Sequence, residues 1–191
     1  MISKANQKLL KVAAVVALFS CIFMNTGRAS LDTLGGYLIQ ATPFDHQMSH
    51  LGDILGSYSV PLTQDDASSN DLFILARSMQ YVPDLSGHDY WQTPEETQAR
   101  WAGDCEDKAV WLFAKLKKHG HSNVRLVIGR YRPVDGNLHV WVTMADDQNN
   151  LWILDPTLQK KIWKSSDFSE GLYRPLYSFD GINRYRHDIK Q

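Results

Sequence analysis

The sequence predicts an α+β fold in which helices of the N-terminal half pack on an antiparallel sheet of the C-terminal half. Three observations carry this prediction. Apolar residues recur at helical spacing between positions 71 and 119. Beyond Gly120 the period falls toward two, and β-branched and aromatic residues become frequent. Turn-forming residues at 145–150 join the last two of these segments as a hairpin, which makes them antiparallel neighbours.

The first 29 residues have the pattern of a secretory signal peptide. Three lysines precede an apolar stretch from Val12 to Met24, and small residues at 27–29 offer a cleavage site. This stretch is shorter than the roughly 20 residues that a membrane-spanning helix needs. We therefore expect residues 1–29 to be removed and residues 30–191 to form a single exported domain.

A lipoprotein is the alternative interpretation of the same segment. Leu18-Phe19-Ser20-Cys21 loosely resembles the motif at which bacterial lipoproteins are cleaved and acylated. That processing would anchor the chain through Cys21. Phe19 fits the motif poorly, so we expect cleavage near residue 29 instead.

The charge of the mature chain argues against nucleic-acid binding. The whole chain has 20 basic and 21 acidic residues, and the first 29 residues hold four of the bases and none of the acids. The remaining 16 bases and 21 acids give a formal charge of −5, whereas nonspecific nucleic-acid binding needs a net or clustered basic surface. About 160 residues suffice for one packed core.

Two helices are expected in the first half of the domain. One spans 71–81, where Asn70 or Asp71 can cap the free amides at its start. The other follows the run Thr93-Pro94-Glu95-Glu96, which combines a capping box with a proline at the first helical position, and extends to about Arg100.

A longer third helix begins near Asp104 or Cys105 and ends near His119, with Gly120 as its stop. Cys105 falls on the core-facing apolar stripe, in the first turn. The thiol is therefore expected at a defined position.

Three strands are expected after this helix, at 124–131, 138–144 and 151–155. A five-residue loop at 145–149 would place His139 directly opposite Asp155, on one face of the hairpin. Their side chains would then be close enough for a hydrogen bond. The tail beyond residue 164 carries aromatic residues but no clear period.

Cys105 is the only cysteine after position 29, so it has no internal disulfide partner. A thiolate nucleophile needs a base and a group that orients the base, and His139 and Asp155 supply these. The helix start and a neighbouring imidazolium would lower the thiol pKa from about 8.5 by several units. Backbone amides at the helix start, with the Trp91 indole or the Tyr90 hydroxyl, would hold an oxyanion.

The order of these residues, with cysteine at a helix start and histidine and aspartate on neighbouring antiparallel strands, resembles the transglutaminase-like superfamily and its papain/transglutaminase-like fold. More narrowly, the runs Asp89-Tyr90-Trp91-Gln92-Thr93-Pro94 and Gly103-Asp104-Cys105-Glu106-Asp107 resemble the LapG-like family of bacterial transglutaminase-like cysteine proteinases. The resemblance spans residues 70–157.

The resemblance implies a periplasmic cysteine peptidase with Cys105, His139 and Asp155 as its catalytic triad. It further implies a protein substrate, such as a surface adhesin, and a regulatory receptor in the inner membrane. The chemistry itself requires no cofactor, but the resemblance implies a calcium site at Asp104 and Glu106. Two carboxylates cannot complete the six to eight oxygen ligands of calcium, so further ligands are needed.

Two other functions remain open at this point. If an amine instead of water attacks the thioester, the protein is a protein-glutamine acyltransferase. If the fold only binds a partner, Cys105 is a small buried apolar residue and His139 a core histidine. Asp104 is then only a helix cap.

Overall fold

The structure is a computed structural model of the whole chain, and it describes residues 34–49, 51–52, 56, 67–85, 88–132, 137–169 and 171–187. The expected signal peptide and Cys21 lie outside these residues. The described residues belong to one compact unit. No helix among them is long and apolar enough to cross a membrane.

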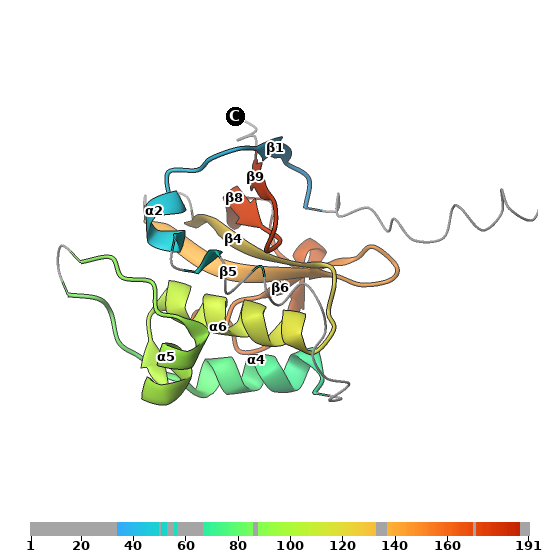
Figure 1. Cartoon of the computed structure of the whole chain (residues 1–191). Helices are drawn as coiled ribbons and strands as arrows, with labels where there is room; N and C mark the ends of the chain where they lie inside the picture. Colours follow the sequence, from blue (N-terminus) through green and yellow to red (C-terminus); the bar gives the residue numbers. More distant parts are fainter. Residues whose placement is uncertain are drawn as a thin grey trace, which may run out of the picture. The chain divides into compact units, whose positions relative to one another are not determined.

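A seven-stranded antiparallel sheet, in the order β1-β9-β8-β4-β5-β6-β7, forms the centre of this unit (Figure 1). Its strands are β1 (Tyr37–Ile39), β4 (Val124–Tyr131), β5 (Leu138–Ala145), β6 (Leu151–Leu154), β7 (Trp163–Lys164), β8 (Tyr173–Phe179) and β9 (Arg184–Arg186). Two short strands, β2 (Gln80–Tyr81) and β3 (Ala102–Gly103), form a separate parallel pair.

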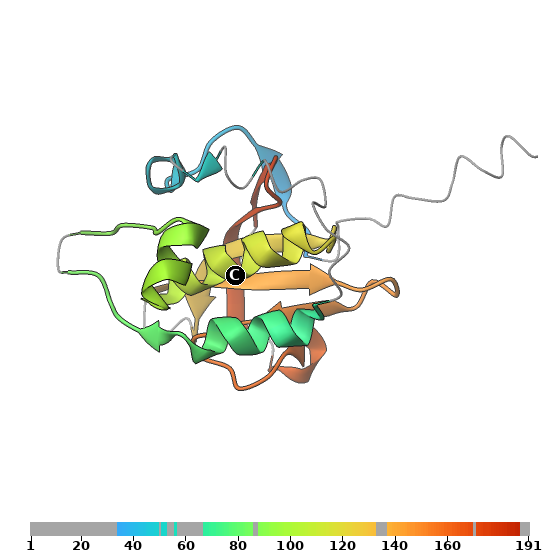
Figure 2. The ribbon, with the colours of Figure 1, turned by 60° about the horizontal axis from the view of Figure 1, so that its bottom comes forward.

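Helices cover one face of the sheet (Figures 1 and 2). Helix α6 (Cys105–Lys118) packs on β4 and β5, and α4 (Ser69–Ser78) and α5 (Pro94–Arg100) pack on α6. The main core lies between these helices and the sheet. The expected arrangement of helices on an antiparallel sheet is therefore confirmed.

A smaller core lies on the opposite face of the sheet. It consists of Val127, Trp141 and Ile153, with Phe168 and Tyr173 packed against them. Because successive side chains of a strand point to opposite faces, these residues alternate with those of the main core.

The two helices nearest the candidate cysteine begin as the sequence predicts. At the start of α5, Thr93 Oγ1 accepts the Glu96 N–H at 3.2 Å and Glu96 Oε2 accepts the Thr93 N–H at 2.8 Å. Helix α6 begins at Cys105, with Asp104 as its N-cap. Gly120 follows its end with a φ of 88°, a conformation that favours glycine.

Helix α4 differs from the expectation for residues 71–81. It starts at Ser69, because Ser68 caps it by accepting the Asp71 N–H at 3.2 Å. It ends at Ser78, since the residues that follow form β2 and pair with β3.

The register of the β5–β6 hairpin also differs from the expectation. Ala145 pairs with Leu151, which moves the five-residue loop to 146–150. The cause is Asp146, whose Oδ1 accepts the N–H groups of Gln148 and Asn150 at 2.9 Å each. The expected pairing of His139 with Asp155 is therefore wrong by two residues.

Candidate active site

His139 and Asp155 meet directly despite the shifted register. A shift of two residues keeps a side chain on the same face of the sheet, so the two residues become diagonal neighbours. His139 Nε2 lies 2.8 Å from Asp155 Oδ2. His139 is 7% exposed and Asp155 is fully buried. Because an ionised carboxylate only accepts, Nε2 carries the hydrogen and Nδ1 of the neutral ring is left as an acceptor.

The carboxylate of Asp155 receives four donors in all. Its Oδ1 accepts the backbone N–H groups of Thr157 and Leu158, both at 3.0 Å. Its Oδ2 accepts the Tyr173 hydroxyl at 2.7 Å in addition to His139. A buried charge persists only when it is paired and hydrogen-bonded. The four donors meet this condition and hold the carboxylate in one orientation.

Aromatic rings enclose the imidazole of His139. Trp141 stacks on it, with ring centroids 6.0 Å apart and planes inclined by 24°, and Tyr131 approaches edge-on with centroids 6.3 Å apart. Gly129 is the residue directly opposite His139 on β4. A Cβ at this glycine would overlap the Trp141 ring and the backbone of Arg174, so the close packing beside His139 requires glycine.

The sulfur of Cys105 lies against β5 at Val140, the residue that follows His139 in the chain. It accepts a hydrogen bond from the backbone N–H of Val140. Strand β6 ends at Leu154, opposite Val142, and therefore does not reach Val140. The start of α6 thus places the thiol at Val140, in the part of β5 that has no partner on β6.

The proton of the thiol points to a carboxylate and not to the imidazole. Cys105 Sγ donates to Glu106 Oε2 at 2.9 Å. In the part of the chain that the structure describes, no hydrogen bond joins Cys105 to His139. The structure therefore brings His139 and Asp155 into contact and places Cys105 at the backbone of Val140, the residue after His139, without a hydrogen bond from the thiol to the imidazole.

The pKa of Cys105 is shifted in the direction opposite to the expectation. Burial raises the pKa of the thiol above its ordinary value, and the charge and hydrogen bond of Glu106 raise it further. The expected lowering is therefore wrong for this arrangement. The physical reason is that burial penalises the charged thiolate most, and the charges of Glu106 and Asp104 add to this penalty.

Three carboxylates gather beside the thiol. One oxygen each from Asp84, Asp104 and Glu106 lies within 4.8 Å of the others. Burial raises the pKa of Asp104, and burial raises that of Glu106 to about 8, with Asp104 contributing through its charge. Asp104 Oδ1 is buried, and no described residue forms a hydrogen bond with it. Hard oxygen ligands in this arrangement suit calcium.

Asp84 was not predicted by the sequence analysis. It precedes Asp104 by 20 residues and lies between β2 and α5, so local spacing gave no reason to select it. The parallel pairing of β2 with β3 carries it toward the start of α6, because Val82, the residue after β2, donates its N–H to the Gly103 carbonyl at 3.1 Å. The short β2–β3 pair is thus what assembles the acidic cluster.

Asp107 ties the start of α6 to the segment before α5. Its Oδ1 accepts the Gln92 N–H at 2.8 Å, and its Oδ2 accepts the Asp104 N–H at 3.2 Å and the Gln92 amide. Burial raises the pKa of Asp107 to about 6. A Cβ at Gly103 would overlap the Asp107 side chain, so the position of Asp107 requires glycine at residue 103.

The donor expected at Trp91 is engaged elsewhere. Its indole N–H donates to Asp89 Oδ1 at 3.0 Å, and the ring is 3% exposed within the main core. The Tyr90 hydroxyl likewise donates to Glu96 at 3.1 Å. This geometry does not support the expected oxyanion role of either residue, and the run that contains them serves to place Gln92 on Asp107.

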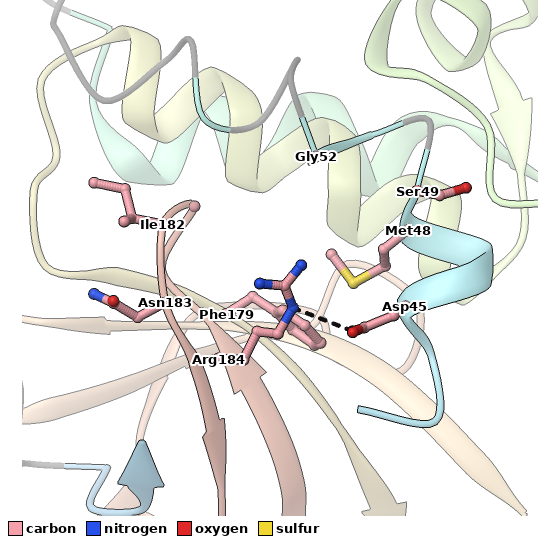
Figure 3. A pocket seen from close by; sticks show the side chains of 9 residues that line it. Asp45, Met48, Ser49, Gly52, Phe179, Ile182, Asn183 and Arg184 are labelled. Carbon is pink, nitrogen blue, oxygen red and sulfur yellow. Dashed lines mark hydrogen bonds and ion pairs between the residues drawn. The ribbon is translucent and has the colours of Figure 1, made fainter. Parts of the chain in front are cut away.

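A cavity of about 320 Å³ lies away from these residues, between α2 (Asp45–Met48) and the turn that joins β8 to β9 (Figure 3). Arg184 Nε donates to Asp45 Oδ1 at 3.2 Å across it. None of the candidate catalytic residues lines this cavity. The interaction of Arg184 with Asp45 ties the N-terminal segment to the last strand.

The fold and the placement of these residues define a class. A cysteine at the start of a helix, with that helix packed on an antiparallel sheet that carries the histidine and aspartate, is the papain/transglutaminase-like arrangement. The expectation from the sequence is confirmed at the level of the fold.

Within this class the chain is similar to solved structures of LapG from Legionella pneumophila. The EGTA-treated form has 20% sequence identity and a TM-score of 0.57, with 80% of this chain and 82% of that chain covered. The calcium-bound form has 20% identity and a TM-score of 0.55, with 79% and 86% covered. At this identity the likeness establishes a common fold. The sequence matches no family model and no curated protein.

Proposed function

We propose that this chain is an exported cysteine peptidase, in which Cys105 is the nucleophile, His139 the base and then the acid, and Asp155 the group that orients His139. The observation that carries the proposal is the buried contact between His139 Nε2 and Asp155 Oδ2, next to the strand position that holds the sulfur of Cys105. The fold it shares with LapG supports the same class of reaction.

The proposed reaction follows from the tautomer of His139. With Nε2–H held by Asp155, Nδ1 accepts the proton of the thiol, and the sulfur attacks the carbonyl carbon of the peptide. The C–N bond then breaks, His139 returns the proton to the leaving amine, and an acyl-thioester remains. Water attacks the thioester, His139 takes a proton from that water, and Cys105 leaves and is reprotonated. Backbone amides at the start of α6 stabilise the oxyanion.

The thiol must first leave its hydrogen bond to Glu106. A rotation of the Cys105 side chain about its Cα–Cβ bond exchanges this acceptor for another. In this resting arrangement the hydrogen bond to Glu106 Oε2 keeps the proton on sulfur. A change in the charge of the acidic cluster is the simplest way to release it.

The acidic cluster fits calcium, which would supply that change of charge. Asp84, Asp104 and Glu106 would hold the ion, and the unpartnered Oδ1 of Asp104 offers it a ligand atom. A calcium ion held by these residues would offset the repulsion among the carboxylates and would compete with the thiol for Glu106. LapG has been solved in calcium-bound and EGTA-treated forms, which supports a calcium role here.

The proposed substrate is a protein of the cell envelope, such as a surface adhesin, and the proposed location is the periplasm. The N-terminal pattern of residues 1–29 and the resemblance to LapG-like proteinases support both. A regulatory receptor in the inner membrane belongs to the same proposal. The acidic mature chain supports the exclusion of nucleic acid as a partner.

The test combines active-site labelling with a search for cleavage. The mature protein, with calcium, is treated with iodoacetamide near neutral pH, and the modified residue is mapped by mass spectrometry. Cys105 should react far faster than free cysteine, and His139→Ala should lose this excess. Cell-envelope proteins are then incubated with wild type and with Cys105→Ser, and new N-termini are sequenced.

Each outcome decides between the functions. New N-termini that require Cys105 support a peptidase. Fast labelling with cross-linked products in place of new N-termini would identify an acyltransferase. Equally slow labelling of wild type and His139→Ala, with no cleavage, would leave only the noncatalytic binding module.

A further inference from the structure

The hydroxyl of Tyr173 shares an acceptor with the imidazole of His139. Tyr173 lies on β8, 18 residues after Asp155, and its Oη is 2.7 Å from Asp155 Oδ2. His139 Nε2 is 2.8 Å from the same oxygen. The mechanism proposed above does not use Tyr173, although no other side-chain hydroxyl among the described residues donates to Asp155.

The direction of the Tyr173 hydrogen bond is fixed by Gln159. Gln159 Nε2 donates to Tyr173 Oη at 2.9 Å. Because an amide nitrogen only donates, the tyrosine oxygen accepts this bond and turns its own proton toward Asp155. Burial, and then the charge of Asp155, raise the pKa of Tyr173 above its ordinary value. The hydroxyl therefore stays a donor over the range in which an enzyme of this kind works.

The ring of Tyr173 is held by the same aromatic residues that enclose His139. Its centroid lies 5.1 Å from that of Trp141 and 5.0 Å from that of Tyr131. Phe168 packs on it from another side, with centroids 5.1 Å apart. These contacts leave the hydroxyl little freedom, so its position relative to Asp155 is set by packing.

We propose that Tyr173 is a positioning residue of the proposed active site, which locks Asp155 Oδ2 against His139 Nε2 and so keeps Nδ1 free to accept the thiol proton. The inference rests on the proposed function. With Oδ1 occupied by two backbone amides and Oδ2 by Tyr173, the carboxylate cannot turn away from His139. The imidazole is thereby held in the Nε2–H tautomer.

The test substitutes Tyr173→Phe, which keeps the ring contacts and removes only the donor. The matched control is Tyr185→Phe. Tyr185 Oη donates to Asp180 Oδ2 at 2.8 Å, so the control loses the same kind of bond in a place without His139. The Gln159→Leu variant provides a second, milder disturbance of the same chain of hydrogen bonds.

The first measurement is the ¹⁵N NMR spectrum of histidine-labelled protein, with His139 assigned by its absence in His139→Gln. Wild type should show Nε2 protonated and Nδ1 bare. Tyr173→Phe should show a mixture of both tautomers, Gln159→Leu a smaller shift in the same direction, and Tyr185→Phe the wild-type spectrum. A Tyr173→Phe protein with wild-type His139 shifts overturns the inference.

The second measurement is the pH profile of Cys105 alkylation with calcium present. Tyr173→Phe should slow the reaction near neutral pH by roughly tenfold, the scale expected for one hydrogen bond to a charged group, and Tyr185→Phe should not. If the control slows it equally, Tyr173 has only a structural role. If wild type and His139→Gln react at equal rates, the proposed function fails, and the NMR result still decides whether Tyr173 sets the tautomer.

Discussion

The two ends of the candidate site treat buried carboxylates in opposite ways. At one end, Asp155 receives four hydrogen bonds and is paired with a histidine. At the other, one oxygen each from Asp84, Asp104 and Glu106 lies within 4.8 Å of the others, and Asp104 Oδ1 has no hydrogen-bond partner among the described residues. The first arrangement is suited to orient a base. In the second, the carboxylates repel one another, and a bound cation would offset this repulsion.

This difference shows which part of the site is complete without a bound ion. The base and its orienter need nothing beyond the protein, because donors from β5, β8 and the segment after β6 converge on one carboxylate. Cys105, the proposed nucleophile, lies between the two ends, and its thiol donates to Glu106. In the proposed mechanism the chain therefore supplies the base by itself, whereas the reactivity of the nucleophile depends on the charge of its acidic neighbours.

The largest effect is expected from replacing Cys105, the proposed nucleophile, which lies between the two ends. Cys105→Ser should lower hydrolysis of the identified substrate by at least about a thousandfold, because the reaction has no other route to the acyl intermediate. Calcium binding, measured by calorimetry, should persist, since the three carboxylates remain. If Cys105→Ser lost calcium binding as well as activity, the acidic cluster would depend on the thiol, contrary to this prediction.

The next largest effect is expected from a substitution that changes only the pair of His139 and Asp155. In Asp155→Asn the side-chain amide can donate to Nε2, which reverses the tautomer and removes the acceptor for the thiol proton. The rate of hydrolysis should fall by about 10³- to 10⁴-fold.

Asp180→Asn is the matched control for that change. Asp180 also accepts two backbone amides and a tyrosine hydroxyl, but no histidine. An equal loss of activity in both variants would show that Asp155 serves only to hold the backbone.

A smaller effect concerns the acidic end. Calcium at about a hundredfold excess over its dissociation constant should stabilise the fold by about 2.7 kcal/mol, which thermal melting measures. Asp84→Asn should remove most of this gain and slow thiol labelling with calcium present. A melting temperature unchanged by both calcium and EGTA would exclude the site.

The last prediction concerns the pH dependence of stability without calcium, an effect that is spread over several pH units. The pKa of Glu106 is about 8 in the folded chain, above its ordinary value of 4.5. The folded state therefore binds the extra proton between these values, and its stabilisation is complete below pH 4.5 and lost as the pH rises through 8. Asp107, with a pKa of about 6, acts in the same direction.

In EGTA the free energy of unfolding, measured by urea denaturation, should therefore fall between pH 5 and pH 8, by at most about 1.4 kcal/mol per pH unit from Glu106. Glu106→Gln should flatten this slope. A free energy of unfolding that rises over the same range would contradict the proposed state of the cluster.

The sequence predicts best what local chemistry determines. The capping box at Thr93 and the start of α6 at Cys105 follow from residues within one helical turn, and the structure shows both. The strands β4 and β5 follow from their composition. The meeting of His139 with Asp155 was predicted with a register wrong by two residues, and it survives because such a shift preserves the face.

Contacts between distant segments could not be predicted in this way. Asp84 reaches the cluster through the two-residue pair β2–β3, and Tyr173 reaches Asp155 from a strand in a tail without clear periodicity. The pKa of Cys105 was predicted with the wrong sign for a similar reason. A helix start and a histidine are visible in the sequence, but burial beside Glu106 is a property of the packed site.

The most direct measurement is the rate of Cys105 alkylation from pH 4 to pH 10, with calcium and with EGTA. With calcium, wild type should keep a high rate well below the ordinary thiol pKa, and His139→Gln should lose it. In EGTA the rate should rise only above that pKa. Identical profiles under the two conditions, with no dependence on His139, would contradict a cysteine nucleophile controlled by the base on one side and the acidic cluster on the other.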